Sequence, residues 1–227
     1  MKKIFSCLAL ASLLLPISSY SQAKKDTTIK KSQGSDQGGS VAVAEGSPTK
    51  AIQELEAKSD HYKAGPNLSA EDKANNVRIK KEIINGTFDV RELSRVALDK
   101  HWSKISAAEQ NSFVDLMVQL LEKRAILAKE QTKTQGKAYT VKYLGDTFIE
   151  GNKKAKTKTQ IYVPKENTKV AIDYKLVKIA AGWKIFDVIV DNASLVDNYK
   201  FQFNSIITKN GFPELMSRMR KKLAEMK

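Results

Sequence analysis

The sequence is poor in the residues that build metal centres and disulfide scaffolds. Its 227 residues include one cysteine, Cys7, and two histidines, His61 and His101. A single cysteine excludes a disulfide-stapled scaffold and a cysteine-rich zinc site. Two histidines leave little material for a histidine-rich metal centre, and they fall on separate predicted helices. We therefore predict that the protein holds no metal and no cofactor of its own.

Acidic residues are also few, since 25 Asp and Glu stand against 39 Lys and Arg. The resulting net charge of +14 suggests contact with nucleic acid or with an anionic membrane. Hydrophobic residues make up 41% of the chain, which is too many for a wholly disordered protein.

The common catalytic and nucleotide-binding motifs are missing as well. The chain has no GxGxxG, GxxxxGKS/T, HExxH, CxxC or GxSxG pattern. Asp187 and Asp191 flank the end of an apolar strand, where a buried carboxylate would suit a general base. The favoured alternative is that these carboxylates cap the turn into the next helix. We therefore predict that the protein is not an enzyme.

The N-terminus has the features of a secretory signal peptide. Lys2 and Lys3 precede a mainly apolar run from Ile4 to Leu15, and Ser21-Gln22-Ala23 offers small residues for cleavage. The run is shorter than the roughly 20 residues that span a bilayer. Cleavage after residue 23 would remove Cys7 and both of these lysines, so the net charge would fall from +14 to +12.

Three regions follow from composition. Residues 1–23 are the predicted signal peptide. Residues 24–48 are rich in Gly, Ser and Gln without an apolar period, and predict a disordered tether. Residues 49–227 are the predicted folded domain.

Hydrophobic periodicity divides this domain into helices, strands and helices again. Helical spacing begins near Thr49, and further helices are predicted to open at Ser69, at Thr87 and at Ser106, where Glu109 completes a capping box. Asn85-Gly86 is predicted to stop the helix that opens at Ser69. Period-two alternation follows in four short runs, at 139–144, 157–163, 170–176 and 183–185. Helical spacing returns after Asn192 and, beyond Gly211, from Phe212. The order predicts an α+β fold with a four-stranded antiparallel meander between N-terminal and C-terminal helices.

Two basic clusters account for part of the positive charge. Lys153, Lys154, Lys156 and Lys158 are predicted on a hairpin loop, and a second cluster (Arg218, Arg220, Lys221, Lys222) lies on the last helix. The aromatic residues fall on apolar faces rather than beside these clusters, and export leads away from nucleic acid. We expect a solvated surface, or docking on anionic lipids or an acidic partner, and no nucleic acid.

Two stretches of the chain resemble the MlaC family, also called the toluene-tolerance auxiliary family. The first consists of Phe88-Asp89-Val90, Leu98, Trp102, Phe113 and Leu120-Leu121. The second consists of Tyr174-Lys175-Leu176, Gly182 to Val188, Ser194 to Tyr199, Gln202-Phe203 and Gly211-Phe212. The chain departs from the family pattern at two glycines, which are replaced by Asn192 and by Asp99-Lys100.

The resemblance implies a periplasmic phospholipid carrier of the system that maintains outer-membrane lipid asymmetry. It implies a cone-like fold similar to that of nuclear transport factor, in which sheet and helices wrap a hydrophobic lipid pocket. The implied ligand is a phospholipid. The implied partners are an outer-membrane lipoprotein complex and an inner-membrane ABC transporter complex with its substrate-binding membrane component. We expect the carrier to act as a monomer.

Apolar residues on the predicted helix and strand faces are the candidates for lining this pocket. They are Phe113, Met117, Leu120, Leu121, Tyr139, Val141, Tyr143, Ile161, Val163, Ile172, Tyr174, Leu176, Ile185, Tyr199 and Phe203. For each of them the alternative is a place in an ordinary filled core.

Two other functions remain open at this point. In the first alternative, the protein carries a different lipid, such as a hopanoid. In the second, the fold hosts an isomerase- or dehydratase-like enzyme. Asp187 and Tyr174 are the catalytic candidates of the enzyme, which requires both side chains in one pocket.

Overall fold

The computed structural model describes residues 42–124, 139–164 and 167–226, and its element order is the predicted one. The N-terminal helices are α1 (Pro48–Ser59), α2 (Ala70–Thr87), α3 (Val90–Leu98), the 3-10 helix η2 (Asp99–Lys104) and α4 (Ala107–Arg124). The strands are β1 (Thr140–Ile149), β2 (Lys154–Val163), β3 (Thr168–Ile179), β4 (Gly182–Val190) and β5 (Ala193–Ser194). Helices α6 (Leu195–Asn210) and α7 (Phe212–Glu225) complete the fold. Residues 1–41, which hold the predicted signal peptide and most of the tether, lie outside the described residues.

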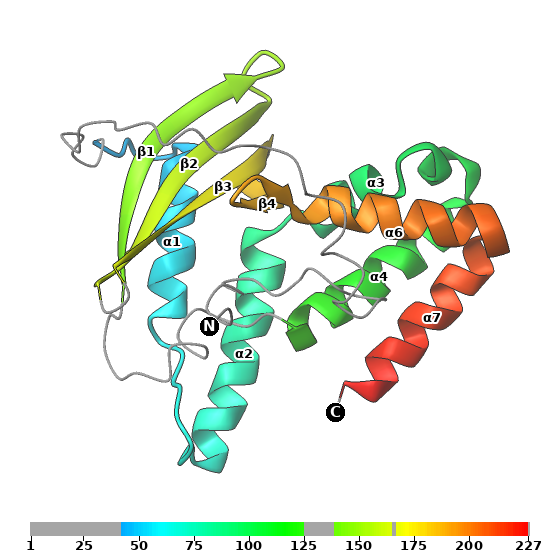
Figure 1. Cartoon of the computed structure of the whole chain (residues 1–227), viewed down its shortest axis with the longest axis horizontal. Coiled ribbons are helices and arrows are strands. Elements are labelled where there is room, and N and C mark those ends of the chain that lie inside the picture. Colours follow the sequence, from blue (N-terminus) through cyan, green and yellow to red (C-terminus); the bar gives the residue numbers. More distant parts are fainter. Residues whose placement is uncertain (1–41, 125–138, 165–166, 227) are drawn as a thin grey trace.

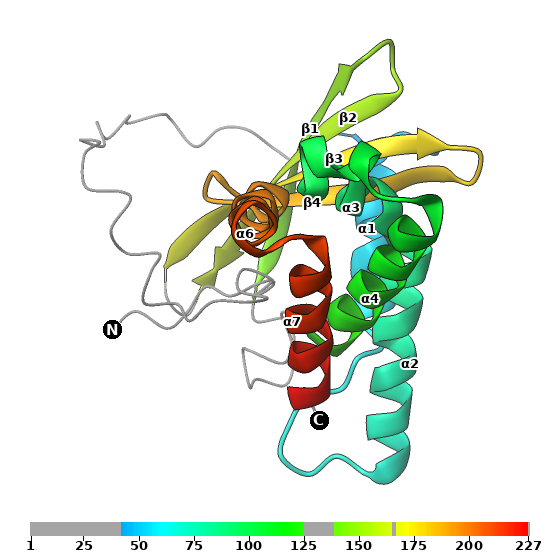
Figure 2. The same cartoon turned by 90° about the vertical axis from the view of Figure 1, so that its right-hand side faces the viewer.

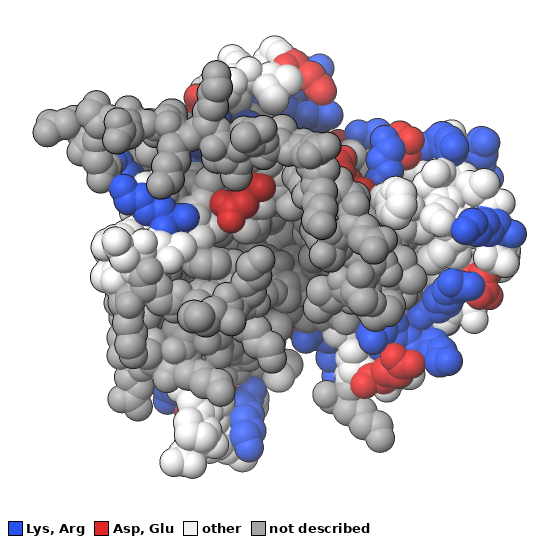
Figure 3. Space-filling model, in the orientation of Figure 1, with Lys and Arg blue, Asp and Glu red and all other residues white. Residues whose placement is uncertain are grey.

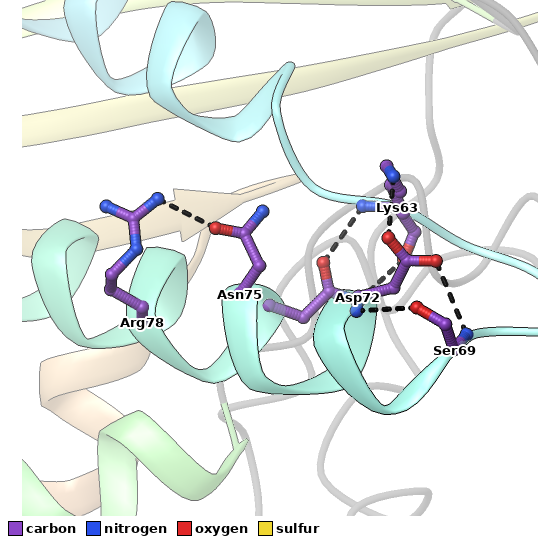
Figure 4. Close-up of polar contacts among 6 residues, drawn as sticks. Lys63, Ser69, Asp72, Asn75 and Arg78 are labelled. Atoms are coloured by element: carbon purple, nitrogen blue, oxygen red, sulfur yellow. Dashed lines mark hydrogen bonds and ion pairs between the residues drawn. The ribbon is translucent and has the colours of Figure 1, made fainter.

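Helix starts follow from capping chemistry. The Ser69 hydroxyl accepts a hydrogen bond from the Asp72 amide, and the Asp72 carboxylate accepts one from the Ser69 amide, which is a complete capping box. Asp72 also pairs with Lys63 at 2.6 Å, which ties the α1–α2 connection to the first turn of α2. Figure 4 shows Lys63 and Ser69 reaching Asp72 from two sides, with the Arg78–Asn75 contact one turn further along α2. The Lys63 ammonium, followed by the Ser69 hydroxyl, holds the pKa of Asp72 below its ordinary value.

Two predicted helix boundaries were wrong by a few residues. Helix α2 does not stop at Asn85-Gly86 but continues to Thr87, and α3 opens at Val90 rather than at Thr87. The N-cap of α3 is Asp89, whose carboxylate accepts a hydrogen bond from the Glu92 amide at 2.8 Å. The predicted capping box at Ser106 and Glu109 is confirmed.

The strands form one antiparallel sheet in the order β1-β2-β3-β4-β5, so the predicted meander is confirmed with one correction. A fifth strand of two residues, β5, pairs with the end of β4 across the turn Asp191–Asn192. Both turn residues have positive φ, 46° and 68°, as a tight two-residue hairpin requires. Asn192 lies where the resemblance implies a glycine, and asparagine tolerates this left-handed conformation better than most residues. Asp99, at the other replaced glycine, also has a positive φ of 49°.

Helices cover the sheet unevenly. Figures 1 and 2 show α1 lying along the sheet, while α4 and α7 lie away from it and pack on other helices. Helices α3 and α6 pack on each other and contact β4. We call the side of the sheet that α1 contacts the inner face and the opposite side the outer face.

Basic side chains lie on the outer face of the sheet and at the end of the molecule formed by α6 and α7. Lys156 and Lys175 belong to the outer face, where they pair with Asp173 and Asp187 at 2.7 and 3.0 Å. Of the lysines predicted on one hairpin loop, Lys153 alone lies in the loop, since β2 begins at Lys154. Figure 3 shows Lys and Arg side chains over the α6 and α7 end of the molecule.

Candidate functional site

The inner face of the sheet is the apolar surface on which a site can be built. The strand register sets Ile161 beside Val170, Leu176 beside Ile185, and Tyr174 beside Val188. Because side chains alternate across a strand, these pairs share one face. Five of the residues predicted to bind lipid lie on this face and are buried: Ile161, Ile172, Tyr174, Leu176 and Ile185.

Burial decreases toward the β1 edge of this face. Tyr139, Val141 and Tyr143 are only half-buried, whereas Leu176 and Ile185 on the inner strands are fully buried. Strand β1 is an edge strand, so it has a neighbour on one side only. The least covered of the predicted lipid-binding side chains on the inner face therefore lie along β1. Val163 ends β2, and its side chain lies outside the described part of the structure.

A polar cluster fixes α1 on this face. The Asp146 carboxylate accepts hydrogen bonds from the hydroxyls of Thr49 and Thr157 at 2.8 and 2.6 Å. About two turns further along α1, the Glu56 carboxylate accepts a hydrogen bond from the Tyr143 hydroxyl. Burial, together with the bond to Glu56, raises the pKa of Tyr143 above its ordinary value. Tyr143 therefore contributes a neutral hydroxyl to the inner face.

Sequence reasoning missed this cluster. Thr157 lies in the apolar phase of β2 beside Thr159, whose hydroxyl donates to the Ile172 carbonyl at 2.7 Å. Two threonines among the buried positions of β2 could have indicated a polar contact here, because a buried hydroxyl requires a hydrogen-bond partner. That partner was not predictable from spacing, since Thr49 and Asp146 are separated by 97 positions.

The other predicted residues gather in a second group, between helices α4 and α6. They are Phe113, Met117, Leu120 and Leu121 of α4 with Tyr199 and Phe203 of α6, and all are at most 1% exposed. Phe203 stacks on Tyr199 with ring centroids 5.5 Å apart and meets Phe113 edge-on at 5.6 Å. Such packing is typical of a filled core. That these six residues line a lipid pocket stays a prediction.

Asp187 and Tyr174 do not share a pocket. Tyr174 pairs with Val188 on the inner face, whereas Asp187 pairs with Lys175 on the outer face. The Asp187 carboxylate is 1% exposed and accepts hydrogen bonds from the Ser194 hydroxyl and the Val196 amide. It joins β4 to the start of α6, which agrees with the capping alternative. Asp191 similarly accepts from the Ala171 amide at 3.2 Å.

A cavity of about 390 Å³ lies on the outer side of the sheet, and none of the predicted lipid-binding residues lines it. Its lining includes Val96, Phe186, Arg95, Lys154 and Glu150. Arg95 and Lys154 lie near Glu92, at 2.7 and 3.7 Å, so these cations are already paired. The cavity therefore has no unbalanced charge that would select an ionic ligand.

Within residues 42–124, 139–164 and 167–226, no three His, Cys, Asp or Glu side chains are grouped as metal ligands. None of the helices described there is long and apolar enough to cross a membrane.

Comparison with known proteins adds two findings. The sequence model of the family described as "MlaC protein" matches residues 53–221. A solved structure of a phospholipid-binding protein from Ralstonia solanacearum, in complex with a phospholipid, matches with a TM-score of 0.59 and 18% sequence identity. The match covers 78% of this chain and 95% of that protein, and shows that the two share a fold. No curated protein sequence matches the chain.

Proposed function

Because the chain belongs to the MlaC family, we propose that it is a phospholipid carrier that shelters acyl chains against the inner face of its sheet. The observation that carries the proposal is the gradient of burial across this face. Its apolar side chains are closed off at Leu176 and Ile185 and half-covered at Tyr139 and Val141. The phospholipid bound by the Ralstonia protein of the same fold supports the same cargo here.

Tail burial provides the driving force. Each buried methylene contributes about 0.8 kcal/mol, so a chain of roughly 16 carbons requires on the order of 12 kcal/mol of shelter. A largely apolar face whose polar groups are hydrogen-bonded provides this shelter. The polar side chains on the face, Asp146, Thr157 and Tyr143, satisfy one another or α1 through hydrogen bonds. Tails that pass them therefore meet paired groups rather than open donors and acceptors.

The acyl chains enter along the β1 edge in this proposal. Tyr139, Val141 and Ile161 line the entrance, and the chains continue toward Ile172, Tyr174, Leu176 and Ile185. The head group stays at the edge in water, since burying its charge without a partner would be costly. The helical group around Phe113 and Phe203 is not part of this path.

The carrier works in the periplasm, which it reaches after cleavage of the signal peptide at residues 1–23. Residues 24–48 are its tether and residues 49–227 its lipid-binding domain. It exchanges phospholipid between an outer-membrane lipoprotein complex and an inner-membrane ABC transporter complex, and it performs no chemistry on the lipid.

Mass spectrometry of the gently purified protein tests the proposal. We expect one phospholipid species to co-purify, and Val141→Trp to lower its amount several-fold by filling the entrance. Val77→Trp is the matched control, because Val77 is 68% exposed on α2, away from this face. Its lipid content should equal that of the unchanged protein.

Two outcomes would overturn the proposal. A protein that purifies without lipid, and takes up none from phospholipid vesicles, is not a carrier. A bound lipid that contains no phosphate, such as a hopanoid, would establish a carrier of another lipid class.

A further inference from the structure

Both long hairpins of the sheet end on the same side of the molecule. The register sets Ile149 beside Lys154, Lys154 beside Val177, and Val177 beside Lys184. The β1–β2 and β3–β4 turns both lie beyond this row. They are joined by a hydrogen bond from the Lys178 amide to the Lys153 carbonyl at 2.8 Å. Figure 2 shows both hairpin ends projecting past the helices.

Three large apolar side chains are exposed at this end. Phe148, Ile149 and Ile179 are 51%, 47% and 41% exposed. Large apolar side chains of a sheet are usually packed against the core instead. Phe148 also contacts the ring of Trp183, with centroids 6.0 Å apart, which joins the two hairpins. Phe148 and Ile149 follow one another in β1 and therefore point to opposite faces, so apolar side chains are exposed on both faces of this projecting end.

Lysines surround these apolar side chains. Segments 148–154 and 177–184 contain four lysines and one acidic residue, Glu150. Glu150 pairs with Lys154 at 3.1 Å. Lys153 and Lys178 are exposed, and no carboxylate among the described residues lies within salt-bridge distance of either. Lys178 lies over the Trp183 ring instead, 5.7 Å from its centroid.

We propose that this surface, defined by Phe148, Ile149, Lys153, Lys178 and Ile179 and called here the tip surface, docks on the surface of an anionic lipid bilayer. The apolar side chains would enter the head-group region while the lysines contact lipid phosphates. A membrane fits better than an acidic protein, because exposed apolar side chains stand at the projecting ends of both hairpins, beside two lysines that no described carboxylate pairs. The proposal goes beyond cargo binding, since the tip surface contains none of the residues proposed to line the lipid path.

Flotation with lipid vesicles tests the tip surface. We expect the protein to bind phosphatidylglycerol-containing vesicles at low salt, with weaker binding at high salt and to pure phosphatidylcholine vesicles. Lys153→Gln with Lys178→Gln should weaken the anionic binding roughly tenfold or more. Ile149→Ser with Ile179→Ser should weaken it by about tenfold at either salt concentration.

Matched variants elsewhere on the surface provide the controls. Lys73→Gln with Lys81→Gln removes the same charge from exposed positions of α2. Val77→Ser with Phe201→Ser removes exposed apolar side chains that are 68% and 74% exposed. Both control pairs should bind vesicles like the unchanged protein, and urea unfolding midpoints verify that every variant is folded.

The outcomes separate this proposal from the lipid-carrier proposal. Tip variants that bind vesicles as well as the controls do would overturn the tip surface, whatever their lipid content. Loss of vesicle binding in tip variants that keep their co-purified lipid supports it. Equal binding to neutral and anionic vesicles at both salt concentrations would also overturn it.

Discussion

The hydroxyl of Ser194 donates a hydrogen bond to the buried carboxylate of Asp187 at 2.8 Å, across the turn that joins β4 to α6. The same carboxylate accepts from the Val196 amide at 3.0 Å and pairs with Lys175 at 3.0 Å. Asp187 thus satisfies a helix N-terminus and a lysine at once. It holds α6, which carries Tyr199 and Phe203, in place against the sheet.

Asp187→Ala should lower the free energy of unfolding by about 3 kcal/mol, because it leaves the Ser194 hydroxyl and the Val196 amide without their acceptor. Urea denaturation measures the loss. Asp115→Ala, at an exposed position of α4, is the control and should change stability by less than about 0.5 kcal/mol. Equal stability of the two variants would contradict the assigned role of Asp187.

Helix α1 is held on the inner face by Asp146, so Asp146→Ala should loosen this helix more than the rest of the fold. We expect a loss of about 2 kcal/mol, since two hydroxyls lose a charged acceptor. Hydrogen exchange followed by mass spectrometry should show faster exchange in Pro48–Ser59 than in α4. Asp173→Ala removes a carboxylate that pairs with Lys156 on the outer face, and should leave exchange in α1 unchanged.

Truncating an apolar side chain should affect stability and bound lipid differently in the helical group around Phe113 and on the inner face of the sheet. Met117 is fully buried among helices, so Met117→Ala should cost about 2–4 kcal/mol in stability and leave the co-purified lipid unchanged. Val141 is half-buried at the proposed entrance, so Val141→Ser should cost less stability and reduce the lipid. If the Met117→Ala variant is fully folded and still loses its co-purified lipid, α4 lines the pocket instead.

Fold class and strand order could be read from the sequence because they rest on local patterns. Period-two alternation identified the four long strands, and capping residues such as Ser69 and Ser106 located two helix starts. Strand β5 was missed because two residues carry no period. Helix α2 overran Gly86 because packing against α4 and β4 offsets the helix-breaking tendency of Asn85-Gly86.

The candidate site was less accessible to sequence reasoning. A buried apolar side chain has the same pattern in a filled core as on a lipid path, so Phe113 and Ile172 could not be distinguished. The contacts of Asp146 and Asp187 join different elements, and no spacing along the chain reports them. Exposed apolar residues at Ile149 and Ile179 follow normal strand alternation, and only the register brings them to one end of the sheet.

Asn192 should tolerate glycine but not alanine. Its φ of 68° lies in the left-handed region, where a Cβ is costly and the asparagine side chain is better accommodated than alanine. Asn192→Ala should lower the free energy of unfolding by about 1 kcal/mol, while Asn192→Gly should leave it unchanged or raise it slightly. Urea unfolding of both variants provides the measurement, and equal effects of the two would contradict the conformational explanation.

Acid should selectively weaken the ion pair between Glu92 and Arg95. The guanidinium of Arg95 bonds to the Glu92 carboxylate at 2.7 Å and, with Lys154, lowers the pKa of Glu92 below its ordinary value. A carboxyl with a lowered pKa in the folded state stabilises the fold at any pH above its value in the unfolded chain. That contribution is lost as pH falls from the ordinary Glu value of about 4.3 through the lower folded value. Glu92→Gln should therefore cost about 0.5–1 kcal/mol at neutral pH, because the pair is partly screened by solvent.

The difference between Glu92→Gln and the unchanged protein should disappear at pH values below this range. Urea unfolding at a series of pH values follows it. Glu54→Gln is the control, since Glu54 is exposed on α1 and no described basic side chain lies within salt-bridge distance of it. A pH-independent difference for Glu92→Gln would mean that the substitution acts through packing rather than through the charge of Glu92.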